Sequence, residues 1–450
     1  MEVGEIYEGI VVDINDKGQG VLKYQNMAVF LDGGLPGDKV TFKIKTLKKK
    51  YAIASIEEIV KKAKDRIDAP CKYFGQCGGC QIQNLEYSSQ LNLKRKQVEN
   101  TINRIGGLKD LKCDVIYGME NPYYYRNKVQ MPIQKINGEI KIGFFKRGTH
   151  EVIDIDECII QHKNNNNIIK GIKKWIEENN IKIYDEKSHK GNIRHLIIKM
   201  DFKTEKWLLI IVGRKRELVF KNELISILEA NSNGFTGLIY NQNIEKSNVI
   251  LGKKFEKIYG SEKLTMHLGS LKFKISAPAF FQVNTKQTEK LYERALKMAD
   301  LDGSEIVYDL YCGTGSISLF LAKASKKVIG IEIIKEAIDD ARENAKINDI
   351  NNVEFYAGDV KEVFPKRYAK GDIADVVVID PPRKGCNEKV IDTICEMEPK
   401  KVVYISCNPA TLARDIKYFN LKGYKVELIE LVDLFAHSVH IESVVKLVKK

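Results

Sequence analysis

The hydrophobic and polar positions change their period along the 450-residue chain. In residues 1–60, short runs alternate between apolar and polar side chains, and glycines such as Gly18, Gly33 and Gly37 separate the runs. A period of two indicates strands with one buried face, and glycines between the runs indicate turns. The expected strands are Ile6–Asp13, Gly20–Tyr24, Met27–Phe30, Lys39–Leu47 and Ala52–Ile59. Strands this short and this close together predict a small OB-like β-barrel over residues 1–60.

From about residue 266 onward, short apolar runs alternate with longer amphipathic ones. We expect strands at 305–310, 327–331, 353–357, 374–379, 401–406, 423–430 and 439–448. We expect helices at 285–299, 315–325, 335–347, 387–396 and 409–419. This alternation predicts an open, mostly parallel, doubly wound sheet, so we assign residues 266–450 to a Rossmann-like α/β domain.

The middle segment, residues 61–265, contains one amphipathic helix at 84–105 and then a mixed α+β pattern. It holds 37 basic and 24 acidic residues, so it accounts for the whole net charge of +13. A basic surface indicates a polyanionic partner, most simply nucleic acid. The alternative is a lysine-rich composition with no such partner, which the Asn164–Asn167 run supports. A lysine cluster on one barrel hairpin, Lys43, Lys45 and Lys48–Lys50, could also follow a phosphate backbone.

Three of the nine cysteines, Cys71, Cys77 and Cys80, lie within ten residues of one another around a Gly-Gly pair. Glycines let successive thiolates turn toward a common centre, and thiolates bind zinc and iron–sulfur clusters. A four-thiolate site needs one more cysteine, and Cys158, or alternatively Cys113, can supply it. The spacing of five and then two residues differs from the paired knuckles of zinc ribbons. It therefore favours a [4Fe–4S] cluster over zinc in the central domain.

Acidic residues and glycines end successive strands of the predicted α/β sheet. Asp309 precedes the turn Gly313-Thr314-Gly315, and Glu332 and Asp359 end the next two strands. A Gly-x-Gly turn lets a ligand approach the backbone, and an acid after the second strand is placed to bind ribose hydroxyls. The full dinucleotide fingerprint Gly-x-Gly-x-x-Gly does not occur here. The set suits an adenosyl group with a positive sulfonium and no phosphate.

Cys407 lies between the apolar run Val402–Ser406 and a predicted helix that begins with Asn408 and Pro409. Asn408 suits the N-cap, and Pro409 suits the first helical position. Ligands bind at this edge of open α/β sheets, and a helix N-terminus favours a thiolate, so we expect a lowered thiol pKa. This placement indicates a nucleophile, and the alternative is a small buried apolar cysteine.

Two more carboxylates are expected near this edge. Asp380 is followed by two prolines, which stiffen the loop that presents it. Glu442 opens an otherwise apolar strand, so its pKa could be raised and it could act as a base. The alternative for Glu442 is a surface position on an edge strand. Where many amino methyltransferases have an aromatic residue after Pro-Pro, this chain has Arg383.

These residues together resemble the RNA 5-methyluridine methyltransferases, the RlmD/TrmA group, and its 23S rRNA branch most of all. The resemblance covers nearly the whole chain. It is carried by the Cys-x5-Cys-x2-Cys loop, Phe-x-Gln-x-Asn, Asp-Leu-Tyr-Cys-Gly-x-Gly, Asp-Pro-Pro-Arg-x-Gly, Ser-Cys-Asn-Pro-x-Thr-x-x-Arg-Asp and His-x-Glu. It implies that the N-terminal barrel is a TRAM domain and that residues 266–450 form a class I methyltransferase domain.

The resemblance also implies a role for particular residues. It implies a [4Fe–4S] cluster on Cys71, Cys77, Cys80 and Cys158. It implies S-adenosylmethionine contacts at Gln282, Tyr311, Glu332 and Asp380, beside the positions Asp309, Gly313, Gly315 and Asp359 inferred above. It marks Cys407 as the nucleophile and Glu442 as the base.

The chemistry of uracil methylation fits these residues independently. C5 of uracil is a poor nucleophile, and a thiolate that adds to C6 activates it. We therefore expect methylation of uridine C5 in RNA, with 23S rRNA as the first candidate and tRNA as the alternative. A target base inside a helix must leave its stack to reach such a site.

Three other functions are less consistent with the sequence. A radical methylthiotransferase would need a Cys-x3-Cys-x2-Cys loop, and Arg383 argues against an exocyclic-amine methyltransferase. A non-catalytic RNA-binding protein is the alternative from another class. No apolar run approaches the roughly 18 residues of a membrane span. The odd cysteine count and the acidic N-terminus favour a cytoplasmic protein, which we expect to be a monomer.

Overall fold

The computed structural model describes residues 1–109 and 111–450. The chain forms two compact units. One comprises Met1–Lys94, Gly143–Cys158 and Phe435–His440, and the other comprises Arg95–Ile142, Ile159–Leu434 and Ile441–Lys450. None of the helices in the described residues is both long enough and apolar enough to span a bilayer.

The first unit begins with a six-stranded sheet in the order β1-β5-β6-β4-β3-β2. Its strands are β1 (Ile6–Ile10), β2 (Asp13–Ile14), β3 (Gln19–Tyr24), β4 (Met27–Asp32), β5 (Lys39–Leu47) and β6 (Tyr51–Lys61). The apolar residues at alternate positions, among them Leu22, Val29 and Phe42, form its core. The prediction of a short-stranded β-domain is confirmed, and the first expected strand is split into β1 and β2.

The rest of the first unit packs around a second small core. This core joins Ile14 and Leu35 of the β-domain to Ile82, Leu93 and Val439. The loop with Cys71, Cys77 and Cys80 lies here, together with β10 (Val152–Asp154) and the end of β9 (Glu139–Phe145). The cysteine loop therefore belongs to the same compact unit as the N-terminal β-domain.

The second unit contains two large sheets and a two-stranded hairpin. The smaller of the large sheets includes β8 (Lys128–Ile136), β11 (Ile193–Met200), β12 (Trp207–Gly213), β13 (Phe235–Gln242) and β14 (Lys254–Gly260). Every residue of β11 and β12 is buried. Strand β15 (Lys263–Leu268) of the hairpin with β16 (Leu271–Ser276) packs on β11 and β12, helix α3 (Lys221–Asn231) packs on β13, and helix α2 (Asn165–Glu178) packs on α3.

The larger sheet has the order β19-β18-β17-β20-β21-β23-β22-β7. Its strands are β17 (Ile306–Leu310), β18 (Lys327–Glu332), β19 (Val353–Ala357), β20 (Val376–Ile379), β21 (Lys401–Ser406), β22 (Tyr424–Val432), β23 (Glu442–Lys449) and β7 (Val115–Tyr117). Strands β17 to β21 are parallel to one another, and β23 runs antiparallel between β21 and β22.

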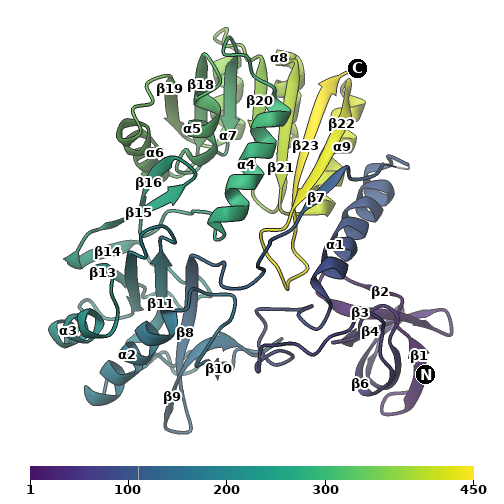
Figure 1. Ribbon diagram of the computed structural model, residues 1–450, viewed down its shortest axis with the longest axis vertical. Helices are drawn as coiled ribbons and strands as arrows, with labels where there is room; N and C mark the ends of the chain where they lie inside the picture. Colours follow the sequence, from purple (N-terminus) through teal and green to yellow (C-terminus); the bar gives the residue numbers. More distant parts are fainter. Residues whose placement is uncertain (110) are drawn as a thin grey trace. The chain divides into compact units, whose positions relative to one another are not determined.

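Helices flank this larger sheet (Figure 1). They are α4 (Thr285–Ala299), α5 (Ser316–Ala322), α6 (Lys335–Ile347), α7 (Val360–Tyr368), α8 (Glu388–Met397) and α9 (Pro409–Leu421). Helix α4 packs against α5, and α8 packs against both α7 and α9. The prediction of an open doubly wound sheet is confirmed. Helix α7, which contains Pro365, and strand β7 were not predicted.

The predicted helix 84–105 is α1 (Tyr87–Thr101), followed by a π-helical turn at Ile102–Gly106. Helix α1 runs from the first unit into the second. There Val98 and Ile102 join the core of the larger sheet, which also contains Leu412 and Phe419 of α9. Cys113 belongs to the same core, and burial raises the pKa of its thiol to about 12. This places Cys113 among apolar side chains of the larger sheet.

Candidate active site

Cys407 and Glu442 come together at the carboxyl end of β21. In the antiparallel pair of β21 and β23, Ser406 lies opposite Ser443. Cys407 follows Ser406 and Glu442 precedes Ser443, so the next position of the ladder sets the two residues side by side. The neighbouring parallel strand β20 ends at Ile379, which puts Asp380 at the same edge.

The loop of Cys407 is held by its neighbours in the way the sequence predicts. The Asn408 side chain accepts a hydrogen bond from the Ala410 N–H at 3.0 Å, and Pro409 starts helix α9. The Asn408 amide also donates to the Arg383 carbonyl at 3.0 Å, and the Thr411 hydroxyl donates to the same oxygen at 3.3 Å. The side chains of Asn408 and Thr411 therefore both hold the Asp-Pro-Pro-Arg loop next to Cys407 by hydrogen bonds.

Asp415, further along α9, fixes the same loop. Its Oδ2 accepts hydrogen bonds from the Tyr404 hydroxyl at 2.6 Å and from the Cys386 N–H at 2.8 Å. Gly385 has a φ of 81°, and a Cβ there would lie 2.5 Å from the Arg414 guanidinium and 2.7 Å from the Asp415 carboxylate. Only glycine fits this close approach of loop and helix.

The thiol pKa of Cys407 differs from the prediction. Burial, followed by the negative charges of Glu442 and Asp380, raises the pKa of Cys407 to about 11, against a smaller lowering by Arg383. The prediction of a lowered pKa from the helix N-terminus was wrong. It considered only the helix, and the desolvation and two nearby carboxylates outweigh that effect.

Glu442 is a buried residue on an interior strand. Strand β23 lies between β21 and β22, so the alternative of an exposed edge position is excluded. Only 3% of the residue is exposed. Burial and the charge of Asp380 raise the pKa of this carboxyl well above its usual value. The expected raised pKa is confirmed.

Asp309 and Asp380 add two more desolvated carboxyls. Burial raises the pKa of Asp380 to about 7. Burial, together with the charges of Asp380 and Glu332, raises the pKa of Asp309 to about 7, although the Ser318 hydroxyl donates to Asp309 Oδ2. Asp309 Oδ1 is buried and has no hydrogen-bond partner among the described residues.

The turn after β17 is shaped by Tyr311, Gly313 and Gly315, which all have positive φ, at 70°, 55° and 75°. The Gly313 N–H donates to Glu332 Oε2 at 3.3 Å, and the Ile334 N–H donates to Oε1 at 2.9 Å. A Cβ on Gly313 would meet no atom within 4 Å, so open space adjoins this backbone. Glu332, at the end of β18, is therefore joined to the turn that contains Tyr311, Gly313 and Gly315.

Asp359 and Gln282 are held by neighbouring segments. Asp359 caps helix α7 by accepting from the Lys361 N–H at 3.2 Å, and it also pairs with the Lys361 ammonium at 3.3 Å. The Gln282 carbonyl accepts from the Asn127 side chain at 2.9 Å. Gln282 precedes α4, whose N-cap is Asn284.

Comparisons with known proteins show the family to which the chain belongs. Residues 86–450 match the family described as tRNA (uracil-5-)-methyltransferase, and residues 1–56 match the TRAM domain. The chain belongs to the tRNA (uracil-5-)-methyltransferase family. It is 43% identical over 439 residues to a protein named as an uncharacterized RNA methyltransferase of Clostridium tetani, covering 98% of this chain and 95% of the relative. A relative with the same description in Clostridium acetobutylicum is 44% identical over 441 residues, with 98% and 96% covered.

Among solved structures, the chain is similar to the tRNA (uracil-54, C5)-methyltransferase of Pyrococcus abyssi in complex with S-adenosyl-L-homocysteine. The TM-score is 0.80 at 27% sequence identity, and the match covers 98% of this chain and 100% of the other. The family and the fold of the α/β domain, with a TRAM domain at the N-terminus, are therefore those predicted from the sequence.

S-adenosylmethionine, the methyl donor of this family's reaction, fits the residues at the turn. Asp309 offers a buried oxygen without a partner among the described residues, and Gly313 adjoins open space. Burial and the charge of Asp380 raise the pKa values of both Asp309 and Glu442. A sulfonium cation nearby would stabilise the ionised forms of these carboxyls. Tyr311 belongs to this turn, and Glu332, at the end of β18, accepts a hydrogen bond from it through the Gly313 N–H.

One residue near these carboxyls was not predicted. The charges of Asp380, Asp309 and Glu442 all act on the Tyr292 hydroxyl, and with burial they raise the pKa of Tyr292 above its ordinary range. This hydroxyl shares a 2.7 Å hydrogen bond with the Ser316 hydroxyl at the start of α5. Tyr292 looked like an ordinary core position of an amphipathic helix, so the sequence held no signal for it.

The iron–sulfur prediction is not supported by the structure. The described residues contain no group of three or more His, Cys, Asp or Glu side chains that could hold a metal ion. Cys71, Cys77, Cys80 and Cys158 all belong to the first unit and are only partly buried. Gln83 contacts two of them, because it accepts from the Cys71 N–H at 3.0 Å and its amide lies 3.9 Å from Cys80 Sγ. An iron–sulfur central domain is therefore not shown.

Proposed function

We propose that this protein transfers a methyl group from S-adenosylmethionine to C5 of a uridine in RNA, with Cys407 as the nucleophile and Glu442 as the base. The observation that carries this proposal is that Glu442 lies near Cys407, one position beyond the Ser406–Ser443 pair, in the same sheet as the Asp309–Gly313 turn. One nucleophile, one desolvated carboxyl and one acidic turn that adjoins open space are the groups that the reaction needs.

The reaction begins when the thiol of Cys407 releases its proton to solvent and the thiolate sulfur bonds to C6 of the uracil. The C5–C6 π electrons move toward O4 and make C5 nucleophilic. S-adenosylmethionine supplies, when bound, an electrophilic methyl group. Glu442 then takes the proton from C5, the C5–C6 double bond forms again, and Cys407 leaves as the S–C6 bond breaks.

Raised pKa values favour the protonated forms of two groups at this site. Burial is the largest cause for both the Cys407 thiol and the Glu442 carboxyl, and the charge of Asp380 adds to it at each. Arg383 opposes this effect at both residues. Only the unprotonated form of Glu442 can act as a base, and a nearby positive charge favours that form.

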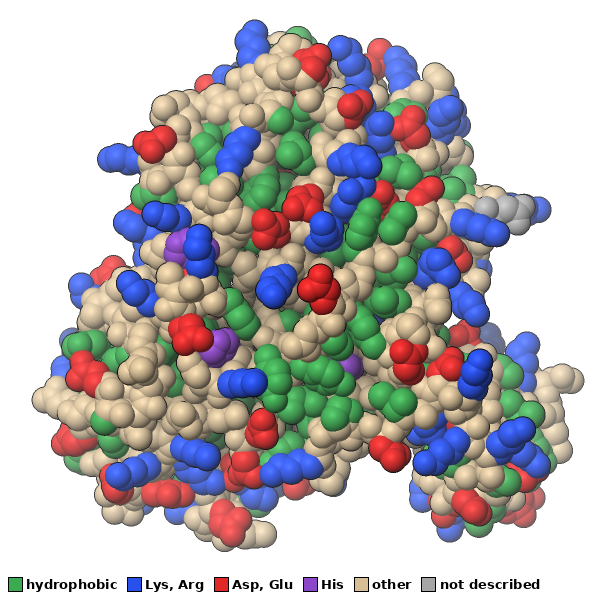
Figure 2. Space-filling view, in the orientation of Figure 1, with side chains coloured by type: hydrophobic (Ala, Val, Ile, Leu, Met, Phe, Trp, Pro, Cys, Tyr) green, Lys and Arg blue, Asp and Glu red, His purple; other side chains and the backbone are tan. Residues whose placement is uncertain are grey.

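The proposed substrate is 23S rRNA, on the resemblance of the whole motif set to that branch of the family. tRNA is the second candidate, which the similarity to the Pyrococcus abyssi tRNA (uracil-54, C5)-methyltransferase favours. On the face drawn in Figure 2, lysine and arginine side chains are interspersed with acidic ones rather than gathered into one patch. The figure therefore does not distinguish the two RNAs.

A second proposal is that Cys71, Cys77, Cys80 and Cys158 bind a [4Fe–4S] cluster. Its support is the thiolate-forming donor set within one compact unit, with Cys71 close enough to Cys77 to raise its thiol pKa, after the larger effect of burial. Cluster binding requires the loop to rearrange, because the four cysteines do not form a metal-binding group among the described residues.

The reaction is tested by comparing unmodified 23S rRNA and tRNA transcripts as methyl acceptors with labelled S-adenosylmethionine. Wild type and a Cys395→Ala control, altered on α8, should form 5-methyluridine in one of them, and Cys407→Ala should form none. RNA containing 5-fluorouridine should trap the wild type as a band on a denaturing gel, because fluorine cannot leave as a proton does. Full activity of Cys407→Ala would exclude the covalent route.

Glu442 is tested separately, because it acts after methyl transfer. Glu442→Gln keeps the size of the side chain and removes the base, so a methyl-labelled covalent protein–RNA complex should accumulate. Normal turnover by this variant would show that another group removes the C5 proton. A variant that forms no adduct would show that Glu442 positions the uracil instead.

A further inference from the structure

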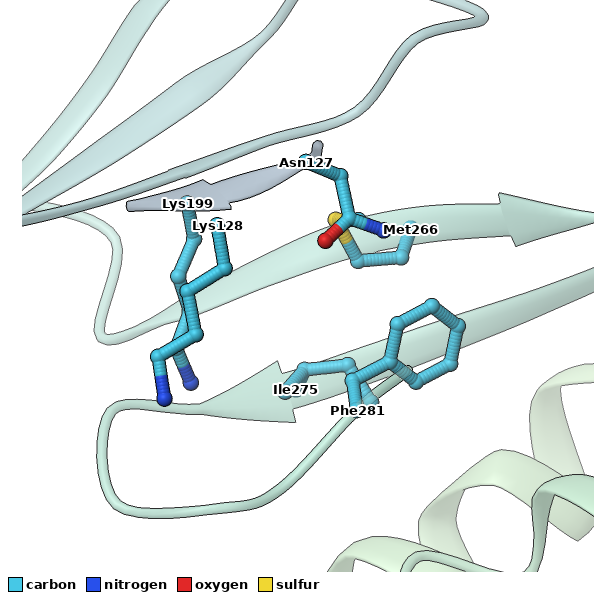
Figure 3. Close-up of a pocket in the computed structure, with 6 residues that line it drawn as sticks. All are labelled: Asn127, Lys128, Lys199, Met266, Ile275 and Phe281. Atoms are coloured by element: carbon cyan, nitrogen blue, oxygen red, sulfur yellow. The ribbon is translucent and has the colours of Figure 1, made fainter. Parts of the chain in front are cut away.

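Two lysines of the smaller sheet share a small pocket outside the catalytic edge. Lys128 on β8 and Lys199 on β11 are register partners on neighbouring antiparallel strands. Both line a pocket with Asn127, Met266, Ile275 and Phe281, and their side chains extend in the same direction (Figure 3). Like charges directly opposite each other destabilise a sheet, so this pairing calls for an explanation.

The ammonium of Lys199 is buried and only partly satisfied. The residue is 4% exposed, and its Nζ donates to the carbonyls of Ser276 at 2.8 Å and Ala279 at 3.0 Å. An ammonium has three N–H donors, so one remains for a ligand. The Lys128 side chain has no hydrogen bond or ion pair with any residue that the structure describes.

The acidic group that acts on Lys199 does not neutralise the pair. This group is Asp340, whose carboxylate accepts from the Ser276 N–H and hydroxyl and pairs with Lys263 at 2.7 Å. Burial, then the charge of Lys128, lowers the pKa of Lys199 to about 7. Burial and Arg126 lower the pKa of Lys128. The described residues therefore supply no carboxylate that forms an ion pair with either lysine, and the repulsion between the two lysines stays uncompensated.

The pocket adjoins the segment that leads to the catalytic edge. Asn127, next to Lys128, donates from its side chain to the Gln282 carbonyl at 2.9 Å and to the Thr285 hydroxyl at 3.0 Å. Its backbone N–H donates to the Val283 carbonyl at 2.8 Å. A ligand on the two lysines would therefore lie next to the segment that carries Gln282 and begins α4.

We propose that Lys128 and Lys199 together bind a phosphate group of the substrate RNA, close to the target uridine. Two neighbouring ammonium groups suit an anion with several acceptor oxygens, and lysine binds phosphate as a point charge. The pocket has about 10 Å³ of free volume, so one phosphate oxygen would enter it rather than the whole group. The remaining walls are Asn127 and the apolar side chains of Met266, Ile275 and Phe281. This proposal depends on the proposed function in one respect, which is that the ligand is RNA.

The test measures RNA affinity at several salt concentrations without S-adenosylmethionine, so it needs no methyl transfer. Lys128→Gln should weaken binding about tenfold or more, as expected when a charge-assisted hydrogen bond is removed. It should also reduce the slope of log affinity against log salt by about 0.7 for each phosphate that the protein no longer neutralises. Lys128→Arg should keep the slope. Lys135→Gln, which removes an exposed charge from the same strand, should leave both quantities unchanged.

A second measurement separates binding from folding. Because Lys128→Gln removes a like-charge repulsion, the ligand-free variant should melt at the same temperature as the wild type or higher. Inorganic phosphate should raise the melting temperature of the wild type more than that of Lys128→Gln. An unchanged salt slope in Lys128→Gln, even if phosphate no longer stabilises that variant, would overturn the proposal and leave only a site for free phosphate. A wild type that binds RNA but transfers no methyl group would instead count against the proposed function.

Discussion

The raised thiol pKa of Cys407 predicts that the nucleophile is unreactive until the charge around it changes. The pKa rises from its ordinary 9.0 to about 11. A difference of about two units lowers the thiolate fraction about 100-fold at neutral pH. The thiolate that does form is about 8-fold more nucleophilic, for a Brønsted slope of about 0.45. Alkylation of Cys407 in the ligand-free protein should therefore be about tenfold slower than that of a cysteine in an unfolded peptide.

The assay is the pH dependence of iodoacetamide modification at Cys407, followed by mass spectrometry of the peptide that contains it. The apparent pKa, rather than the rate, is the quantity to compare, because a bound ligand also limits access. S-adenosylmethionine and S-adenosylhomocysteine form a matched pair of ligands that differ by one methyl group and one positive charge. The sulfonium should lower the apparent pKa by about 1–3 units, as an opposite charge nearby does. The neutral thioether should lower it much less.

Three variants test the cause of the shift in the thiol pKa of Cys407. Glu442→Gln and Asp380→Asn each remove a carboxylate that raises the pKa of Cys407, so each should lower it, and Arg383→Gln should raise it. An apparent pKa at or below about 8.5 in the ligand-free wild type would refute the reasoning. So would equal effects of the two adenosyl ligands, because the argument depends on the sulfonium charge.

Three further predictions concern other parts of the chain. Protein purified without oxygen should contain about four irons per chain. The Cys158→Ser variant should lack this iron, and the Cys113→Ser variant should keep it. Stoichiometric zinc without iron would contradict the cluster. Replacing Lys48–Lys50 by glutamine should reduce the salt slope of RNA binding by about two and weaken cognate and unrelated RNA alike; an altered choice of uridine alone would contradict a phosphate role. Arg294→Met leaves the buried Glu430 carboxylate without its partner and should lower the free energy of unfolding by about 3 kcal/mol. Much of this loss should be recovered when Glu430 is also replaced by Met. An unchanged melting temperature in the single variant would show that the ion pair is not desolvated.

The sequence predicted the α/β domain well because its elements are locally encoded. The strands at 306–310, 327–332 and 401–406 were each found within two residues, since continuous β-branched runs mark buried parallel strands. Helix α9 was predicted from its cap, and Asn408 makes that cap. Helix α7 was missed because Pro365 interrupts a pattern that tertiary packing nevertheless holds helical.

The electrostatics of the site could not be predicted in the same way. The sequence showed that Cys407 precedes a helix, but not that Glu442, 35 residues later, and Asp380 would lie near the thiol. Nor did it show that the charges of three carboxyls would act on the buried Tyr292 hydroxyl. A pKa depends on every charge within a few ångströms, and these charges come from elements distant in the chain.

The spacing within Ser-Cys-Asn-Pro-x-Thr-x-x-Arg-Asp has an explanation that neither the nucleophile nor the methyl donor supplies. Asn408, Thr411 and Asp415 are three and then four residues apart, which places them on one face of helix α9. That face meets the loop at Arg383–Cys386. Asn408 and Thr411 both donate to the Arg383 carbonyl, and Asp415 accepts from the Cys386 N–H. This loop begins at Asp380, so helix α9 also holds the segment that carries Asp380. The charge of Asp380 adds to burial and to Glu442 in raising the thiol pKa of Cys407. The polar residues of the motif therefore act as positioning residues, and Cys407 alone in it is placed to react.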